Sequence, residues 1–432
     1  MKKKLIATLI ISIFVLSCQK ETEKLVPLAL KSQEIVDSLT QFSVDVNLAE
    51  QTSRYFWDSK VEDSKNARVS AKEIEKVVEY KNEEKNTVCF IVNYKDGKGY
   101  TIVSADRRMI PVLAYSEDEN FDDKTENMGI QYWLGIIKDV HKNSQKIKKV
   151  ADDVEKMWRK YDKQSAKNKR IGSAEDCGPL PNNILIPHLT DGISIWGQGS
   201  GYNYYCPNRS GSSCNCGKAA AGCGPVAMGQ VMRYHKKQVS FNNTVFTQAT
   251  FNSMPRWITT SAISNWCTPD GSNNLSISWL LSSLGQSLNV NYSIATNCQT
   301  AVLAPSNIVS LFNQLGYNSF EKSFYSNVGL VDSEILNNRP VILYGSNCNS
   351  CIWNAHIWVL DGLQKSYWWD VIPHYDDYGN YWEECRLGTY TTYQMNWGWN
   401  GGSNGGWFTL YGFNGAGTIY DNASMKAYIV RP

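Results

Sequence analysis

Residues 217–237 read GKAAAGCGPVAMGQVMRYHKK, and this stretch decides how the rest of the chain is interpreted. Gly222 and Gly224 flank Cys223, so the backbone can bend sharply there and approach a ligand closely. Pro225 suits a first helical turn, and the apolar residues after it recur at helical spacing. The pattern predicts a helix beginning near Cys223, whose dipole favours the thiolate. A buried structural cysteine in a tight turn is the alternative, and this stretch alone does not exclude it.

Composition divides the chain of 432 residues into two segments with different character. Lysine is frequent in the first 170 residues, whereas tryptophan, tyrosine, glycine and asparagine are frequent in the remainder. The length predicts two or three domains. The net charge of +2 gives no reason to expect nucleic acid as a partner.

The N-terminus has the pattern of an export signal. Three lysines precede the apolar run Leu5–Leu16, which is too short to span a bilayer permanently. The run ends in VLSC, which resembles a bacterial lipobox, so residues 1–17 are expected to be removed and Cys18 to be lipidated. An ordinary secretory signal with a coincidental cysteine is the alternative. If Cys18 is lipidated, residues 18–33 form a tether to the outer membrane or cell surface, and the lipid anchor is the only expected membrane contact.

The chain has twelve cysteines, and disulfides can persist outside the cytoplasm. Cys18 is assigned to lipid, Cys223 is the candidate nucleophile and Cys89 lies in a strand-like run. The remaining number is odd, so at least one cysteine is free or pairs outside this set, and the connectivity cannot be deduced. Two short motifs could together bind zinc, one with Cys214 and Cys216 and one with Cys348 and Cys351. No histidine pattern accompanies them, so disulfides or free thiols are favoured, and no metal or other cofactor is expected.

Both halves of the chain show an α+β pattern. In the first half, helical patterns cover 32–57 and 130–158, and strands are predicted at 88–94, 100–104 and 112–115, with a hairpin turn at Asp96-Gly97. The lysine-rich stretch Lys160–Arg170 is predicted to be an exposed linker that proteases can cut. In the second half, helices are predicted at 276–290 and 306–315, and strands at 341–344, 356–360 and 407–411.

A cysteine nucleophile needs a base, and the chain has only five histidines. His235 lies twelve residues after Cys223 on the same predicted helix, which is out of reach. His141 lies in a charged helical pattern, His188 in an irregular stretch and His374 in a loop-like setting. His356 begins the predicted strand in NAHIWVLDG, where a rigid strand can hold it beside a cleft. By elimination, His356 is the predicted base.

A third stretch, residues 395–408, reads MNWGWNGGSNGGWF. An asparagine oxygen can accept the proton on the far imidazole nitrogen and thereby fix the tautomer and the ring orientation. Asn396 is placed for that role, and Trp397 or Trp399 could shield the bond from water. On pattern alone, such a Trp-Gly-Trp segment is more often a packed turn than an active-site wall.

In the order Cys, His, Asn, these stretches resemble the papain-like cysteine peptidases, and among them the streptopain family. WGQGSGYNYYCP at 196–207 resembles that family's segment before the nucleophile, and CFIVNYKDGKGYTIVSADRRMIPVLAYSE at 89–117 resembles its propeptide. The resemblance implies a papain-like, two-lobed α+β catalytic domain over 173–432, with the cysteine on a helical lobe and the histidine and asparagine on an antiparallel β lobe. It also implies an inhibitory α+β propeptide over 34–172.

The resemblance further implies a secreted cysteine endopeptidase, held latent by its own propeptide in cis, that cuts protein or peptide substrates near apolar side chains. It implies that Cys223 is the nucleophile and His356 the base. Asn396 would orient the imidazole, and Gln198 would be the oxyanion donor. The implied cleft and shielding residues are Trp397, Trp399, Gly222 and Gly224. Gly224 followed by Pro225 departs from the bulkier apolar residues expected after the nucleophile, which puts the cleft rim in doubt.

Two other functions remain open. A non-catalytic surface lipoprotein could use the same fold to bind host or envelope proteins, but the intact set of four catalytic residues argues against it. A related thiol enzyme could act on cell-wall peptides or as a transpeptidase, but the propeptide resemblance favours general proteolysis.

Overall fold

The structure is a computed structural model of the chain. It describes residues 41–63, 72–161, 177–211, 214–241, 243–260, 266–292, 298–346, 355–375, 381–400, 405–410, 412 and 425–432. The predicted signal and tether, including Cys18, and most of the predicted linker lie outside the described residues. The chain divides into two units, Met1–Phe42 and Ser43–Pro432, and everything below concerns the second. Among the described helices, none combines the length and the apolar composition that crossing a membrane would require.

The N-terminal segment, residues 43–161, is mixed α and β. Its elements are α2 (Val46–Asp63), β1 (Ile74–Lys81), β2 (Thr87–Tyr94), β3 (Tyr100–Ser104), β4 (Val112–Ser116), α3 (Met128–Ser144) and α4 (Asp152–Tyr161). Strands β2 to β4 and the turn between β2 and β3 confirm the predictions, and Asp96 and Gly97 both have positive φ (59° and 64°), as a tight hairpin turn requires. The predicted helix from residue 32 is wrong at residues 41–45, because α2 begins only at Val46; residues 32–40 lie outside the described residues.

The C-terminal segment, from residue 177 onward, contains helices and mostly antiparallel strands. Its elements are β5 (Ile184–Ile186), α5 (Cys223–His235), β6 (Val239–Phe241), β7 (Thr244–Phe246), α6 (Gln248–Ser253), α7 (Gly271–Ser287), α8 (Asn307–Gln314), β8 (Asn318–Ser323), α9 (Val328–Leu336), β9 (Val341–Ser346), β10 (Ala355–Tyr375), β11 (Tyr381–Asn396), β12 (Trp407–Phe408) and β13 (Lys426–Arg431). The predicted strand 407–411 is shorter than expected, and His374 lies in β10 rather than in a loop.

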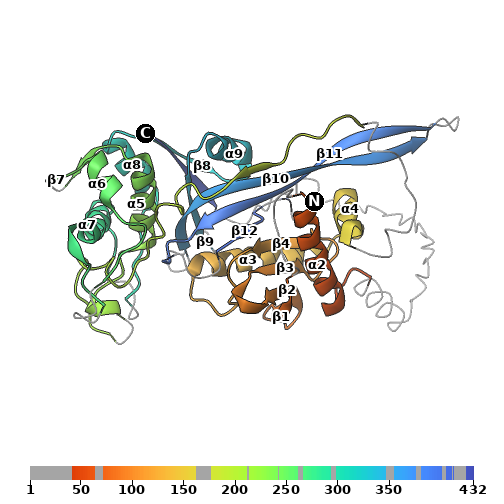
Figure 1. Ribbon diagram of the computed structural model, residues 1–432, viewed down its shortest axis with the longest axis horizontal. Helices are drawn as coiled ribbons and strands as arrows, with labels where there is room; N and C mark the ends of the chain where they lie inside the picture. The colour runs from red at the N-terminus through yellow and green to blue at the C-terminus, as the bar shows by residue number, and fades with distance from the viewer. Residues whose placement is uncertain are drawn as a thin grey trace, which may run out of the picture. The chain divides into compact units, whose positions relative to one another are not determined.

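One sheet joins the two segments. Over the described residues it has eleven strands in the order β1-β2-β3-β4-β12-β11-β10-β9-β13-β8, with β5 also paired to β10. The junction is β4 with β12, where Tyr115 pairs with Trp407 and Ala114 with Phe408. Figure 1 shows the orange N-terminal strands and the blue C-terminal strands meeting there. The N-terminal segment therefore extends the C-terminal sheet edge instead of leaving it exposed.

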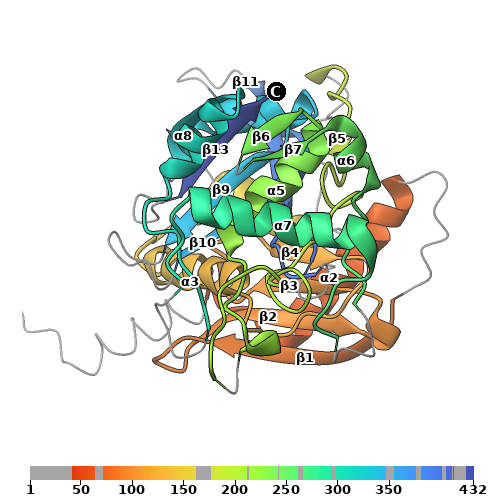
Figure 2. The same ribbon diagram turned by 90° about the vertical axis from the view of Figure 1, so that its left-hand side faces the viewer.

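The sheet separates two apolar cores. Side chains alternate along β10, so Trp358 and Leu360 pack in the core that includes α3, whereas Ile357 and Val359 pack in the core that includes α5. Helix α5 contacts both β10 and α7, and Figure 2 shows α7 crossing in front of α5. The predicted α+β class is confirmed, with Cys223 on the helical layer and His356 and Asn396 on antiparallel strands.

Three disulfides connect distant segments of the described chain. They join Cys177 to Cys385, Cys214 to Cys298 and Cys216 to Cys267. Zinc binding by Cys214 and Cys216 is therefore excluded in this form, while Cys348 and Cys351 lie outside the described residues. Cys89 and Cys206 are buried free thiols, and Cys223 is a partly exposed one.

Candidate active site

The backbone on either side of Cys223 is shaped by two glycines. Gly222 precedes α5 with φ 98° and ψ 144°, a conformation that favours glycine. A Cβ on Gly222 would lie 3.0 Å from the Thr300 hydroxyl oxygen, and one on Gly224 would lie 2.6 Å from a Val302 methyl. The predicted close approach is therefore real, but the approaching group is the 300–302 segment of the protein. Neither glycine lines the cavity beside Cys223, so their predicted role in the cleft is corrected.

Cys223 opens onto a cavity of about 690 Å³. His356, Gln198 and Trp399 also line this cavity. These residues come from α5, β10 and two separate loops, so the fold brings together three of the four predicted catalytic residues. The N-terminal segment contributes to the wall as well, through Glu126, Met128 and Gln131.

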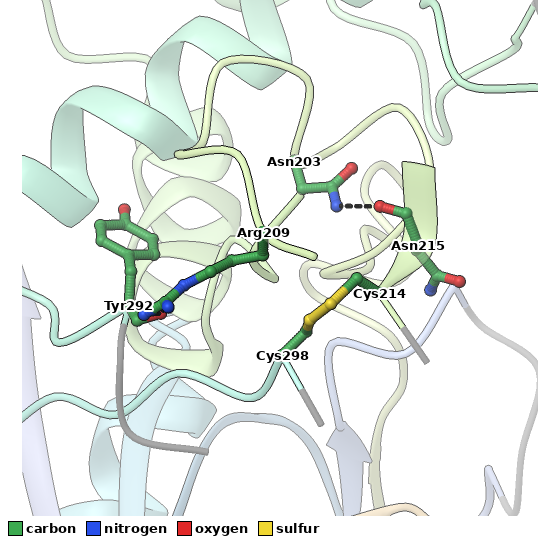
Figure 3. Close-up of a disulfide and its surroundings, with 6 residues drawn as sticks. All are labelled: Asn203, Arg209, Cys214, Asn215, Tyr292 and Cys298. Carbon is green, nitrogen blue, oxygen red and sulfur yellow. Dashed lines mark hydrogen bonds between the residues drawn. A yellow bond between two sulfur atoms is a disulfide. The ribbon is translucent and has the colours of Figure 1, made fainter. Parts of the chain in front are cut away.

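The loop that carries Gln198 is braced against the start of α5. The carbonyl of Gln198 accepts the N–H of Ala221 at 2.8 Å, and the carbonyl of Cys298 accepts the N–H of Ala220 at 3.1 Å. Figure 3 shows Cys298 bonded to Cys214, and beside it the Asn203 amide donating to the carbonyl of Asn215. The disulfide therefore ties together segments that position the predicted oxyanion donor and the nucleophile.

The His356 imidazole lies on the α3 side of β10. Its ring stacks on that of Trp358, with centroids 6.0 Å apart, and its Nε2 lies 3.0 Å from the carbonyl oxygen of Trp397. Because a carbonyl can only accept, Nε2 carries the proton. Burial lowers the pKa of His356 to about 4, and the hydrogen bond to Trp397 only partly opposes this shift. The ring is therefore neutral at pH 7.

The Cys223 thiol is also neutral in this form. The residue is partly exposed, but its sulfur is desolvated, which raises its pKa above the ordinary value, although hydrogen bonds with the backbone of Ile357 and Gly224 act in the opposite direction. The thiolate expected at the helix N-terminus is thus not favoured here, because the sulfur is desolvated and the imidazole is neutral.

The predicted hydrogen bond between Asn396 and the imidazole is not among those of the described residues. The Asn396 amide nitrogen donates to the Thr190 hydroxyl (3.2 Å), the Ser194 carbonyl (2.7 Å) and Gln230 Oε1 (2.9 Å). Instead, the backbone carbonyl of the next residue, Trp397, accepts the His356 hydrogen bond that was expected to go to Asn396. Sequence reasoning missed Gln230, although a signal existed. It lies seven residues after Cys223, on the same face of the helix.

Helix α3 covers the imidazole and Trp397. A Cβ on Gly129 would lie 2.2 Å from the Trp397 ring and 2.8 Å from His356 Cδ2, so only glycine allows the helix this close. Trp397 is buried and packs edge-on against Phe408 and tilted against Trp358. Trp397 therefore packs in the core beside the histidine. Of the two predicted tryptophans, only Trp399 lines the cavity.

Among the described residues, one group of side chains has the composition of a metal site. His188, Asp191 and Asp361 bring potential ligand atoms within 4.8 Å of one another. Both oxygens of Asp361 already accept hydrogen bonds from residues 190 and 191, and His188 Nδ1 lies 3.3 Å from Asp191. These contacts account for the group as a hydrogen-bonded cluster.

Two family models match parts of this chain. Residues 196–408 match the model of the peptidase C10 family, and residues 42–140 match that of the Spi protease inhibitor. A solved structure of a Prevotella intermedia prointerpain A fragment is similar over 82% of this chain and 97% of that one, with 18% identity and a TM-score of 0.47. None of the curated proteins matches the chain.

Proposed function

Because this chain belongs to the peptidase C10 family of cysteine peptidases and includes a Spi-type inhibitor domain, we propose that it is an exported endopeptidase made as a latent zymogen. The observation that carries the proposal is the shared cavity. Cys223, His356 and Gln198 line it together, and residues of the inhibitor domain form part of its wall. A nucleophile, a base and an oxyanion donor around one space are what acyl transfer requires.

In the proposed mechanism, the Cys223 thiolate attacks a peptide carbonyl and a carbon–sulfur bond forms. The oxyanion accepts hydrogen bonds from the Gln198 amide and the N–H of Cys223; removing one such donor typically costs about a hundredfold or more in rate. The protonated His356 gives its proton to the amine as the carbon–nitrogen bond breaks. Water, deprotonated by His356, then hydrolyses the thioester. Asn396 orients the imidazole during both steps.

Latency follows from the contacts of α3. While Gly129 packs on His356 and Trp397, the imidazole stays buried, neutral and hydrogen-bonded to a carbonyl. Cleavage between Lys160 and Cys177 would let the inhibitor domain leave. His356 would then be hydrated and free to turn, which raises its pKa toward the ordinary value and allows an ion pair with Cys223.

The proposal also includes the domain boundaries of the chain and its location. Residues 1–17 are the signal peptide, 18–33 the tether, 34–172 the propeptide and 173–432 the catalytic domain. Cys18 carries the lipid that anchors the zymogen to the outer membrane or cell surface, and processing releases the catalytic domain. Labelling cells with a palmitate analogue tests this address, since Cys18→Ala should abolish incorporation.

The catalytic assignment is tested by a matched pair of cysteine substitutions. Cys223→Ala should abolish both casein hydrolysis and self-processing, because among the described residues Cys223 is the only free thiol that lines the cavity. Cys206→Ala removes a buried free thiol elsewhere in the helical core and should leave both activities within about twofold. Full activity of Cys223→Ala would refute the assignment.

A second assay separates proteolysis from the alternatives. Processed protein is incubated with casein and, in parallel, with peptidoglycan fragments. Release of casein peptides that depends on Cys223 supports general proteolysis. Cleavage of only the cell-wall peptides, or of neither substrate, would replace it with one of the other two functions.

A further inference from the structure

The amide of Asn396 has only one allowed orientation. The nitrogen and oxygen of an asparagine amide are assigned from their hydrogen-bond partners. The carbonyl of Ser194 is a fixed acceptor 2.7 Å from one end of the amide, so that end must be the nitrogen. At the other end, the N–H of Gly398 is a fixed donor 3.3 Å away, so that end must be the oxygen.

Gln230 reinforces the same orientation from helix α5. The N–H of Trp196 is a fixed donor 3.2 Å from Gln230, which identifies the facing atom as Oε1. The same Oε1 lies 2.9 Å from the Asn396 amide and can only accept, so again Asn396 must present its nitrogen. Gln230 is fully buried, which makes this bond expensive to lose.

A third contact is made by the Thr190 hydroxyl, which links Asn396 to the buried carboxylate of Asp361. The Thr190 hydroxyl lies 2.5 Å from Asp361 Oδ1 and 3.2 Å from the Asn396 nitrogen. Burial and the nearby Asp191 raise the pKa of Asp361 to about 6. Asp361 is therefore mainly ionised at pH 7, the hydroxyl proton points to it, and the hydroxyl lone pairs face Asn396. Thr190 and Asp361 are both fully buried.

We propose that Thr190, Gln230 and Asp361 are positioning residues that hold Asn396 with its oxygen on the side of Gly398 and Trp397, ready to accept the His356 N–H. This inference rests on the proposed function. In the latent form, His356 instead bonds to the carbonyl of Trp397, the residue after Asn396. Transfer of the imidazole hydrogen bond from the Trp397 carbonyl to the Asn396 side-chain oxygen would complete the triad. The anchor prevents an amide flip that would present a donor to the imidazole.

The test compares two substitutions at one position in the processed enzyme. Each full-length variant is processed by a trace of trypsin, which is then inhibited, and peptide hydrolysis is measured. Thr190→Val keeps the shape but removes the hydroxyl, and it should lower kcat about tenfold with KM within about twofold. Thr190→Ser keeps the hydroxyl and should restore kcat to within about twofold of the wild type.

A double-mutant cycle separates positioning from general support of the fold. In the Asn396→Ala background, Thr190→Val should cause no further loss of kcat, because its effect passes through Asn396. An unchanged kcat in Thr190→Val, or the same tenfold loss in the Asn396→Ala background, would overturn the inference. If Thr190→Val does not fold, as judged by thermal melting, Gln230→Met takes its place in the cycle with the same expected results.

The pH profile of Cys223 alkylation by iodoacetamide decides the inference even without peptide hydrolysis. A wild type that cuts no peptide would refute the proposed function alone. The alkylation rate of the processed wild type should be nearly flat from pH 5 to 8, as an ion pair predicts, and Thr190→Val and Asn396→Ala should change the profile alike. Identical profiles for the wild type and Thr190→Val would overturn the positioning role.

Discussion

The contact of α3 with the active site gives a sharp prediction for Gly129→Ala. In the zymogen the added methyl would lie 2.2 Å from the Trp397 ring and 2.8 Å from His356 Cδ2. Carbon atoms in contact are separated by about 3.5 Å or more, so the helix must move back by about 1.3 Å. Trp397 cannot yield easily, because Trp358 and Phe408 pack against it.

The expected magnitude follows from overpacking. Forcing one extra carbon into a well-packed contact typically costs about 1–3 kcal/mol. Docking should therefore weaken about five- to 150-fold, and the zymogen should self-process faster and show more residual peptide hydrolysis. The processed Gly129→Ala enzyme should match the wild type, because the substituted residue leaves with the propeptide.

Gly329→Ala is the matched control. Gly329 is also the second residue of a helix, α9, but a Cβ there would meet no atom within 4 Å. Its self-processing rate, measured by gel densitometry and by fluorogenic peptide hydrolysis, should equal that of the wild type. If Gly129→Ala processes no faster than Gly329→Ala, α3 does not hold the site closed through this contact.

Three further outcomes are expected. In the zymogen, alkylation of Cys223 by iodoacetamide, followed by mass spectrometry, should accelerate about tenfold per pH unit from pH 6 to 8, because its raised pKa leaves the thiolate a minor species; a flat profile would contradict this. Lys156→Met removes the ammonium 3.3 Å from the buried carboxylate of Asp370 and should lower the unfolding free energy of the zymogen in urea by about 1.5–3 kcal/mol, so an unchanged midpoint would count against that ion pair. The double substitution Cys177→Ser with Cys385→Ser removes a disulfide between residues 208 positions apart and should destabilise the processed enzyme by about 2–4 kcal/mol. Equal thermal melting of the processed wild type and the processed double variant would contradict this.

Local pattern was enough for several elements. The strands predicted at 88–94, 100–104 and 112–115 and the helix beginning near Cys223 follow from side-chain periodicity and from Gly and Pro positions, which act within a few residues. Strand β1 escaped prediction because half of IEKVVEYK is charged and it forms a sheet edge. Most of β10 also escaped, because Asp, Gly, Gln, Lys and Pro break its strand pattern. Its pairing with β11, from Val359–Asn396 to Tyr375–Tyr381, overrides those preferences.

The sequence by itself determined the residue types, their order and the local elements, and their resemblance to the streptopain family was what predicted a cysteine peptidase with a propeptide. Only the tertiary structure decided which groups meet. It placed Gly129 on His356, gave the imidazole to the Trp397 carbonyl, and surrounded Asn396 with Thr190 and Gln230. Periodicity encodes which face of an element is apolar, whereas such contacts depend on how distant segments pack, and no local pattern contains that information.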